Sequence, residues 1–358
     1  MSEFWNSRAK KLSPYVPGEQ PKDLKLIKLN TNENPYPPSP KVIEAIKNAA
    51  GERLRLYPDP ECSIFREAAA ARYGVKPEQV FAGNGSDEIL AFAFGAFFES
   101  GEKAERMLFP DITYSFYPVY AGLWDIPFST VPLAEDYSIK TSDYKIKSSG
   151  GVVFANPNAP TGVALPLKDI LLLAEYLEKQ GKVLIVDEAY AAFGAESAVP
   201  HIEKHPNLLT VHTLSKSASL AGLRFGFAIG DKNLIEGLCR LRDSFNSYTV
   251  DFLALTGATA AVKDAAYYNE INSRIIATRE RTAKALRGMG FTVLPSSANF
   301  IFAKPPDISG AELFAALRGR GILTRHFKKE RIADFLRISI GKDEDMDTVI
   351  KACGEIVK

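Results

Sequence analysis

The sequence predicts an α/β fold: a large domain with a mostly parallel seven-stranded sheet between helices, then a smaller C-terminal α+β domain. Two observations carry this prediction. Short, continuously apolar runs alternate with segments of helical periodicity, which is typical of parallel strands buried on both faces. After about residue 245 the pattern changes to long helical stretches with two more strands. We therefore expect an N-terminal arm at 1–30, a large domain at 31–245 and a small domain at 246–358.

The expected strands of the large domain are apolar runs bounded by turn residues. They are Val80–Ala82, Met107–Phe109, Pro127–Val131, Val152–Ala155, Val183–Val186, Leu208–Thr213 and Phe225–Ile229. A helix is expected to begin at Ser39-Pro40, because proline suits the first position of a helix, and another is expected at Leu167–Lys179. The small domain is predicted to contain one long helix from Val250 to Met289, strands at Phe300–Ala303 and Phe335–Ile340, and a helix at Ala311–Arg320.

The composition is that of an ordinary globular protein without a surplus of charge. The 358 residues include 44 Lys and Arg against 43 Asp and Glu, a formal net charge of +1, so no nucleic-acid partner is expected. Cys62, Cys239 and Cys353 lack the spacing of a disulfide framework or a metal site, and no metal is expected. The N-terminus has no apolar signal-peptide core and no run reaches membrane length. We therefore expect a cytoplasmic protein without a membrane partner.

Lys216 is the first candidate functional residue. It lies just past the apolar run at Leu208, with the Ser215 hydroxyl beside it and Arg224 further along. A hydroxyl and a guanidinium can hold a phosphate, and a lysine amine can form a Schiff base with an aldehyde. Together they suggest pyridoxal phosphate, a cofactor that acts as an electron sink. Taken alone, the segment is equally consistent with a surface lysine in a Ser-rich turn.

Asp187 ends the apolar strand that begins near Val183. A carboxylate at that position is unfavourable without a cationic partner or hydrogen bonds, and a pyridinium nitrogen would be such a partner. Tyr190 follows three residues later and could donate a hydrogen bond to the phenolic oxygen of the ring. The alternative is a structural Asp that caps the next helix.

Gly85, Ser86 and Asp87 follow the first expected strand and open a helix. Glycine leaves the backbone N–H groups approachable, and a helix N-terminus favours an anion, so this loop is a candidate phosphate site. Asn158 lies in a proline-stiffened turn after another strand, where it presents an amide to a ligand or simply forms a turn. Tyr114 follows the second strand and could stack on a planar ring or belong to the core.

The order of these features along the chain resembles the fold-type I aminotransferases that use pyridoxal phosphate. Within them, it resembles the histidinol-phosphate aminotransferases most closely, over nearly the whole chain. The stretches Tyr15–Gly18, Leu29–Tyr36 and Leu56–Asp59 look like the N-terminal signature of that family, and Leu336–Gly341 looks like its carboxylate-binding site. Many relatives carry Asn directly before Pro-Thr-Gly, whereas this chain has Ala159.

The resemblance implies roles for the candidate cofactor residues. Lys216 would form the Schiff base and then act as acid and base. Asp187 would pair with the pyridinium. The remaining implied contacts are Tyr190 and Asn158 at the phenolic oxygen, Tyr114 at the ring face, and Gly85, Ser86, Asp87, Ser215 and Arg224 at the phosphate.

The resemblance also implies substrate and subunit contacts. Arg337 would bind a substrate carboxylate, and Tyr15 and Arg325 are our candidates for a substrate phosphate. Tyr57 would reach the cofactor phosphate of the neighbouring subunit, so a homodimer is expected. The implied reaction is amino transfer between a small-molecule donor and a keto acceptor, with histidinol phosphate and 2-oxoglutarate as the favoured pair in histidine biosynthesis. An aromatic amino acid aminotransferase and a threonine-phosphate decarboxylase on the same fold remain alternatives.

Overall fold

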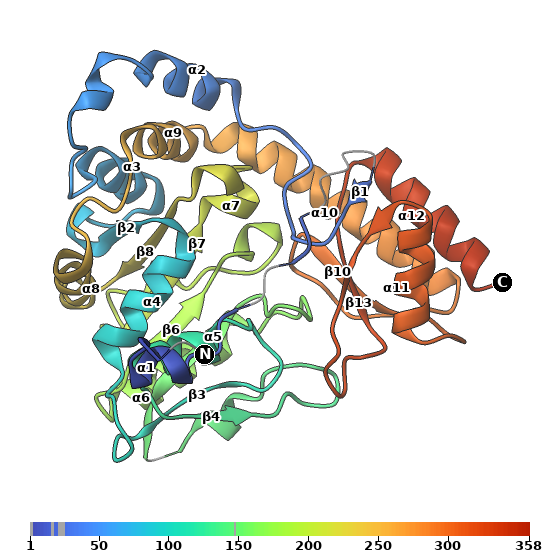
Figure 1. Cartoon of the computed structure of the whole chain (residues 1–358), viewed down its shortest axis with the longest axis horizontal. Helices are drawn as coiled ribbons and strands as arrows, with labels where there is room; N and C mark the ends of the chain where they lie inside the picture. The colour runs from blue at the N-terminus through green and yellow to red at the C-terminus, as the bar shows by residue number, and fades with distance from the viewer. Residues whose placement is uncertain (1–2, 16–17, 21–25, 147) are drawn as a thin grey trace.

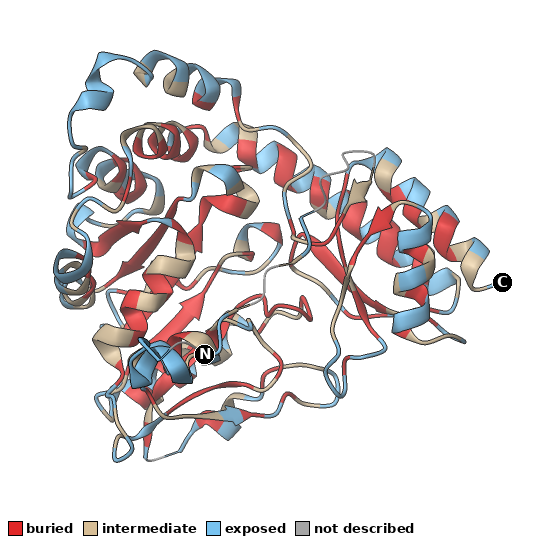
Figure 2. Cartoon of the chain, in the orientation of Figure 1, coloured by how far each residue is buried: buried red, intermediate tan, exposed pale blue. Residues whose placement is uncertain are grey.

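A computed structural model of the chain describes residues 3–15, 18–20, 26–146 and 148–358. It contains one large sheet with helices on both faces and a smaller sheet near the C-terminal end of the chain (Figure 1). The strands and the sheet-facing sides of the helices are buried, whereas the outer sides of the helices are exposed (Figure 2). The predicted fold class is confirmed.

The large sheet contains every strand predicted for it. Its strands are β2 (Val80–Gly83), β3 (Arg106–Pro110), β4 (Phe128–Val131), β5 (Ser149–Ala155), β6 (Leu184–Asp187), β7 (Leu208–Thr213) and β8 (Gly226–Gly230). Their spatial order is β2-β8-β7-β6-β5-β3-β4. All neighbours are parallel except β8, which runs antiparallel to both β2 and β7. The parallel strands β5, β6 and β7 therefore end at the same edge of the sheet.

Helices cover both faces of this sheet. The helices of this part of the chain are α2 (Pro40–Ala49), α3 (Ser63–Tyr73), α4 (Gly85–Phe97), α5 (Tyr117–Trp124), α6 (Leu167–Glu178), α7 (Leu214–Ser217), α8 (Lys232–Phe245) and α9 (Phe252–Lys263), with a separate N-terminal helix α1 (Ser7–Lys11). Short 3-10 helices span Glu52–Arg55, Pro77–Gln79, Thr141–Tyr144, Ala191–Phe193, Val199–His201 and Ala221–Leu223. The helices predicted from Ser39-Pro40 and at Leu167–Lys179 correspond to α2 and α6.

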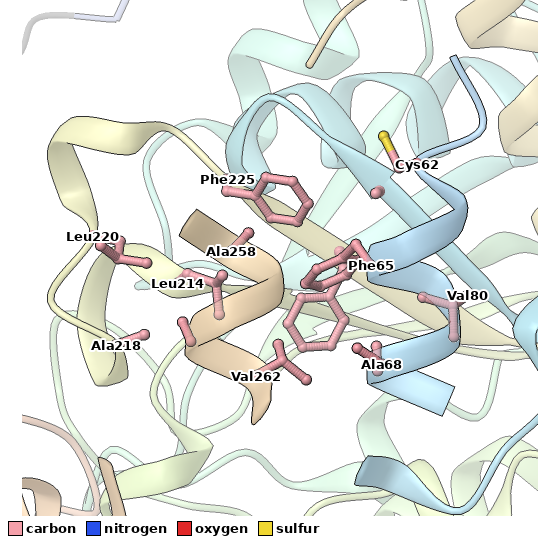
Figure 3. Close-up of a cluster of buried hydrophobic side chains, with 14 of the residues drawn as sticks. Cys62, Phe65, Ala68, Val80, Leu214, Ala218, Leu220, Phe225, Ala258 and Val262 are labelled. Atoms are coloured by element: carbon pink, nitrogen blue, oxygen red, sulfur yellow. The ribbon is translucent and has the colours of Figure 1, made fainter. Parts of the chain in front are cut away.

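Successive strand residues face opposite sides of the sheet, so each central strand contributes to two cores. Val153 of β5 packs in the core that includes α4, α5 and α8, whereas Val152 packs in the core that includes α6. A third core lies between α3, α9 and β8, and Figure 3 shows Phe65, Phe225 and Ala258 meeting there. These cores fix the strands whose ends carry the candidate functional residues.

The long helix predicted from Val250 to Met289 is wrong, because the segment forms two helices, α9 and α10 (Ala265–Gly288). Asp264 lies at the break, where its carboxylate accepts hydrogen bonds from the Ser39 hydroxyl and the Lys41 ammonium at the start of α2. Helical periodicity does not reveal such a side-chain contact. Since α9 packs against α2 and α3, its packing favours a place in the large domain, and the predicted domain boundaries stay a prediction.

The C-terminal part of the chain contains a four-stranded antiparallel sheet in the order β12-β13-β10-β9. Its strands are β9 (Thr292–Val293), β10 (Phe300–Lys304), β12 (Arg325–His326) and β13 (Leu336–Ser339), and its helices are α11 (Gly310–Gly319) and α12 (Asp343–Ile356). A further strand β1 (Ile27–Lys28), from the predicted N-terminal arm, pairs with β11 (Ile322–Leu323) beside this sheet (Figure 1). Within the described residues, we find no helix with both the length and the apolar character needed to cross a membrane.

Candidate active site

A cavity of about 440 Å³ lies where the ends of β5, β6 and β7 meet the N-terminal segment and the C-terminal sheet. Ten of the predicted site residues line it: Tyr15, Ser86, Asp87, Tyr114, Asp187, Tyr190, Ser215, Lys216, Arg224 and Arg337. A second cavity of about 240 Å³ shares Tyr15, Tyr114 and Arg337 with the first and adds Arg325 and Phe327. Residues far apart in the sequence therefore converge on two adjoining spaces.

Lys216 lies in the short helix α7, directly after the end of β7. The Thr213 hydroxyl caps this helix by accepting a hydrogen bond from the Ser215 backbone N–H at 3.1 Å. The Lys216 Nζ donates to the Thr31 carbonyl at 2.9 Å, and the Asn34 side chain donates to the Lys216 carbonyl at 3.0 Å. Burial, with the Arg337 charge adding to it, lowers the pKa of Lys216 to about 8. A substantial share of this amine is therefore neutral, and nucleophilic, near neutral pH.

This lowered pKa predicts how covalent attachment of pyridoxal phosphate depends on pH. Only the neutral amine attacks an aldehyde, so the attachment rate should rise about tenfold per pH unit below pH 8 and become constant above it. The measurement is the growth of the visible absorption band after the cofactor is mixed with cofactor-free protein. An ordinary lysine would level off only near pH 10.5, and a rate that rises through pH 10 here would contradict the prediction.

Asp187 is the last residue of β6, and its side chain is buried at the cavity wall. Its carboxylate accepts from the Ala189 backbone N–H at 3.1 Å and from the Tyr117 hydroxyl at 3.4 Å. Burial is the main cause that raises the pKa of Asp187 to about 7, although the Ala189 N–H favours the ionised form. No ion pair with Asp187 occurs among the described residues. A cationic ring nitrogen in the cavity would supply the missing partner and stabilise the ionised carboxylate.

The opposite end of the cavity is suited to an anion. Gly85 begins α4 with a φ of +80°, and a Cβ there would lie only 2.7 Å from the Arg224 guanidinium, so this position requires glycine. Arg224 donates to the Ser215 hydroxyl and to the Asp87 carboxylate, both at 3.2 Å. Asp87 also accepts from the Tyr114 hydroxyl at 2.7 Å. A helix N-terminus, a hydroxyl and a guanidinium thus converge, which is the chemistry that binds a phosphate.

Arg337 of β13 is partly buried and lines the same cavity as Lys216. One of its terminal nitrogens donates to the Asn30 carbonyl at 2.8 Å, and its Nε has no hydrogen-bond partner. The guanidinium lies 5.5 Å from the ring centroid of Phe300 and 5.6 Å from that of Phe327. A buried N–H donor without a partner is unfavourable by itself, and a carboxylate that accepts two hydrogen bonds from the guanidinium would satisfy it.

The predicted contact of Asn158 with the cofactor ring is not favoured by the geometry. Asn158 does not line either cavity, since its amide nitrogen donates to the Ile112 carbonyl and to the Thr161 hydroxyl, and its oxygen accepts from the Thr113 hydroxyl. Ala159 lines both cavities in its place. The predicted ring contact of Asn158 therefore stays a prediction, one that its hydrogen bonds argue against.

Tyr57 lies outside both cavities of its own chain. It is 82% exposed and stacks on Tyr248 with 4.6 Å between the ring centroids. A contact with a neighbouring subunit needs an exposed side chain of this kind, and that contact stays a prediction.

The N-terminal segment contributes more to the site than the sequence indicated. Thr31, Asn32 and Glu33 line the main cavity, and Tyr15 stacks on Phe116 at 4.2 Å. The sequence signal was the run of polar residues around Asn32, which we interpreted only as a family signature. These residues are distant in sequence from the strands of the large sheet. Sequence spacing therefore does not indicate which side chains they contact.

The fold and this site define a protein that can hold a phosphorylated, aldehyde-bearing ring on a partly buried lysine, in a cavity that also contains a buried carboxylate. The chain belongs to the family described as aminotransferase class I and II, whose sequence pattern matches residues 25–353. It is 53% identical to a histidinol-phosphate aminotransferase from Acetobacter pasteurianus, with 100% of this chain and 99% of the relative covered. It is 54% identical to histidinol-phosphate aminotransferase 1 from Bradyrhizobium diazoefficiens, with 100% of both chains covered. The family resemblance noted in the sequence is confirmed.

Solved structures of two other proteins share the fold. The histidinol-phosphate aminotransferase from Sinorhizobium meliloti, solved in complex with pyridoxal-5'-phosphate, has a TM-score of 0.87 at 24% identity, over 100% of this chain and 98% of that one. A mutant aspartate aminotransferase from Thermus thermophilus has a TM-score of 0.84 at 18% identity, over 99% of this chain and 100% of that one. At these identities the two structures support the fold alone.

Proposed function

We propose that this chain is a pyridoxal-phosphate-dependent aminotransferase that exchanges the amino group between histidinol phosphate and 2-oxoglutarate. The observation that carries the proposal is the partly buried Lys216 amine, with its lowered pKa, in one cavity with the Asp187 carboxylate and the anion site at Arg224. The full-length relatives at 53% and 54% identity support the substrate pair. A role in histidine biosynthesis and a cytoplasmic location are part of the same proposal.

Pyridoxal phosphate, when bound, supplies an electron sink for the substrate α-carbon. Lys216 would hold it covalently, and the Lys216 Nζ would move the α-proton of the substrate. Asp187 would stabilise a protonated ring nitrogen, and Arg337 would orient the carboxylate of glutamate. The other residues proposed to hold the cofactor are Tyr114 at the ring face, Tyr190 at the phenolic oxygen, and Gly85, Ser86, Asp87, Ser215 and Arg224 at the phosphate.

Separate half-reactions test the substrate assignment. The cofactor-loaded protein is mixed with histidinol phosphate, phenylalanine or threonine phosphate, and the loss of the visible band is followed. We expect histidinol phosphate to react with the highest ratio of rate to half-saturating concentration. Reaction with phenylalanine alone would leave an aromatic aminotransferase as the function, and release of carbon dioxide from threonine phosphate would indicate the decarboxylase.

Arg325 provides a prediction about the substrate phosphate. It lines the second cavity with Tyr15 and is the cross-strand partner of Arg337, and the Phe327 ring contacts both guanidinium groups. Because a hydrogen bond to a charged group contributes about 1.5–3 kcal/mol, Arg325→Ala should lower kcat/KM for histidinol phosphate about 10- to 100-fold. The value for phenylalanine should change far less.

Two further variants make this comparison decisive. Arg325→Lys should recover part of the loss, since it restores the charge without the planar fork. Arg240→Ala, which removes an exposed guanidinium of α8, should leave both substrates unaffected. Equal losses for the phosphorylated and the unphosphorylated substrate in Arg325→Ala would remove Arg325 from this role.

The proposal includes a homodimer in which Tyr57 reaches the neighbouring cofactor phosphate. The exposed apolar side chains Leu54, Leu56 and Tyr57 lie on one segment, and Tyr248, on which Tyr57 stacks, is also exposed, as is Phe245 nearby in sequence. Gathered exposed apolar residues are typical of a protein interface. This exposure supports a second copy of the chain as the partner.

Mixed dimers test the subunit contact. Lys216→Ala and Tyr57→Ala subunits carrying different tags are co-expressed, and the mixed dimer is purified by both tags. If Tyr57 acts in the neighbouring site, one site of each mixed dimer has both native residues, so amino transfer should return well above that of either parent dimer. A mixed dimer no more active than the average of its parents would contradict a contribution across the interface.

A further inference from the structure

Asn32 is among the most constrained residues of the site, although its role does not follow from the cofactor contacts above. It is 1% exposed and has a φ of +56°, in the left-handed region that glycine and asparagine adopt more readily than most residues. Its side chain joins the two sides of the cavity. The amide nitrogen donates to the Tyr190 hydroxyl oxygen at 2.9 Å, and the amide oxygen accepts from the Ser339 hydroxyl at 2.9 Å.

The hydrogen bonds around Asn32 fix which way its amide points. The Ser339 hydroxyl oxygen accepts from the Asn32 backbone N–H at 2.9 Å, so the Ser339 hydrogen needs an acceptor of its own. Among the described residues, the amide oxygen of Asn32 is the acceptor that the Ser339 hydroxyl meets, which leaves the amide nitrogen facing Tyr190. The Asn299 side chain donates to the Asn32 carbonyl at 2.9 Å and holds the backbone in place. The donor towards Tyr190 is therefore set by three neighbouring bonds.

This arrangement determines the direction of the Tyr190 hydroxyl hydrogen. The Tyr190 hydroxyl oxygen already accepts a hydrogen bond from Asn32. Among the described residues, none accepts a hydrogen bond from the Tyr190 hydroxyl. Tyr190 lines the main cavity, so the hydrogen is free to meet an acceptor there. Ala159 lines the same cavity and has no amide to offer, and the Asn158 amide is engaged elsewhere. Tyr190 thus has a free hydroxyl hydrogen for a phenolic oxygen, which neither Ala159 nor Asn158 can supply.

We propose that Ser339 and Asn32 form a positioning relay that aims the Tyr190 hydroxyl at the phenolic oxygen of the bound cofactor. The inference rests on the proposed function and deepens it by adding two residues that act through Tyr190. Ser339 and Arg337 both belong to β13 and lie two positions apart, so they are on the same face of that strand. The relay thus ends beside the residue proposed to bind the substrate carboxylate.

The cofactor-loaded protein gives a direct readout of the relay. A hydrogen bond donated to the phenolic oxygen stabilises its negative charge and lowers the proton affinity of the adjacent Lys216 nitrogen. Asn32→Gly removes the amide and suits the positive φ, so the pH midpoint of the visible band should rise by about 0.5–1 pH unit. Ser339→Ala, which frees the Asn32 amide to rotate, should raise the midpoint by less. The charged and titratable groups facing Tyr190 are Arg337, Asp187 and Tyr15, and none is altered.

The same substitutions in a Tyr190→Phe background show whether Asn32 acts through Tyr190. The relay predicts that neither Asn32→Gly nor Ser339→Ala shifts the midpoint there. An unchanged midpoint in the native background, or an equal shift in both backgrounds, would overturn the relay. If Asn32→Gly does not fold, Ser339→Ala alone gives the same comparison. A wild-type protein with no visible band would instead refute the cofactor assignment, which keeps the two failures distinct.

Discussion

Replacement of Lys216 with alanine is expected to abolish the long-wavelength band of the cofactor-loaded protein and to lower amino transfer by about 10⁴-fold or more. The substitution removes both the covalent attachment and the group that moves the α-proton. Neither can be replaced nearby, because Lys216 is the lysine that lines the main cavity among the described residues. Absorption spectra and single-turnover rates with histidinol phosphate measure the two effects separately.

Two controls separate the role of Lys216 from a general loss of structure. Lys168→Ala, at an exposed lysine of α6, should keep both the band and the activity. Lys216→Arg keeps a positive charge but provides no neutral amine, so it should be as inactive as Lys216→Ala. An undiminished band in Lys216→Ala would refute the proposed cofactor attachment.

Asp187→Ala is expected to show the next largest loss. It removes the carboxylate that faces the ring nitrogen in a buried site, and breaking a buried ion pair costs about 3–5 kcal/mol. Cofactor affinity or the rate of α-proton removal should therefore fall by about 10²- to 10³-fold. Titration of cofactor-free protein with pyridoxal phosphate and single-turnover kinetics divide this loss between binding and chemistry.

The charge of Asp187, rather than its size, should account for the effect. Asp187→Asn preserves the shape and should lose nearly as much as Asp187→Ala, whereas Asp187→Glu should retain part of the function. Asp347→Asn, at an exposed carboxylate of α12 that pairs with Arg281, should have no effect on either measurement. Activity in Asp187→Asn close to that of the wild type would show that no cation has to be stabilised there.

Sequence patterns predicted the large sheet well because its strands are buried on both faces and read as apolar runs. The end of such a strand is also recognisable, because the apolar run stops at a polar residue. Asp187 ends β6, and Lys216 follows the end of β7, as these patterns predicted. The break at Asp264 could not be predicted, since it depends on hydrogen bonds with Ser39 and Lys41, far away in the sequence.

The site was predicted less completely than the sheet. The motifs placed Arg337 and Arg224 in the candidate site, but no sequence pattern places Asn32 between Tyr190 and Ser339. Such a residue acts through two side chains from different parts of the fold, and its left-handed backbone leaves no periodic signal. Asn158 shows the converse case, because a motif position alone did not reveal that its amide is engaged by the turn itself.

Identification of the lysine that carries the cofactor tests the central claim most directly. The cofactor-loaded protein is reduced with borohydride, which fixes the lysine–cofactor bond, and its peptides are examined by mass spectrometry. We predict that the added mass is found on the peptide containing Lys216 and on no other lysine. A label on a different lysine, or no label in a protein that shows the visible band, would contradict the account.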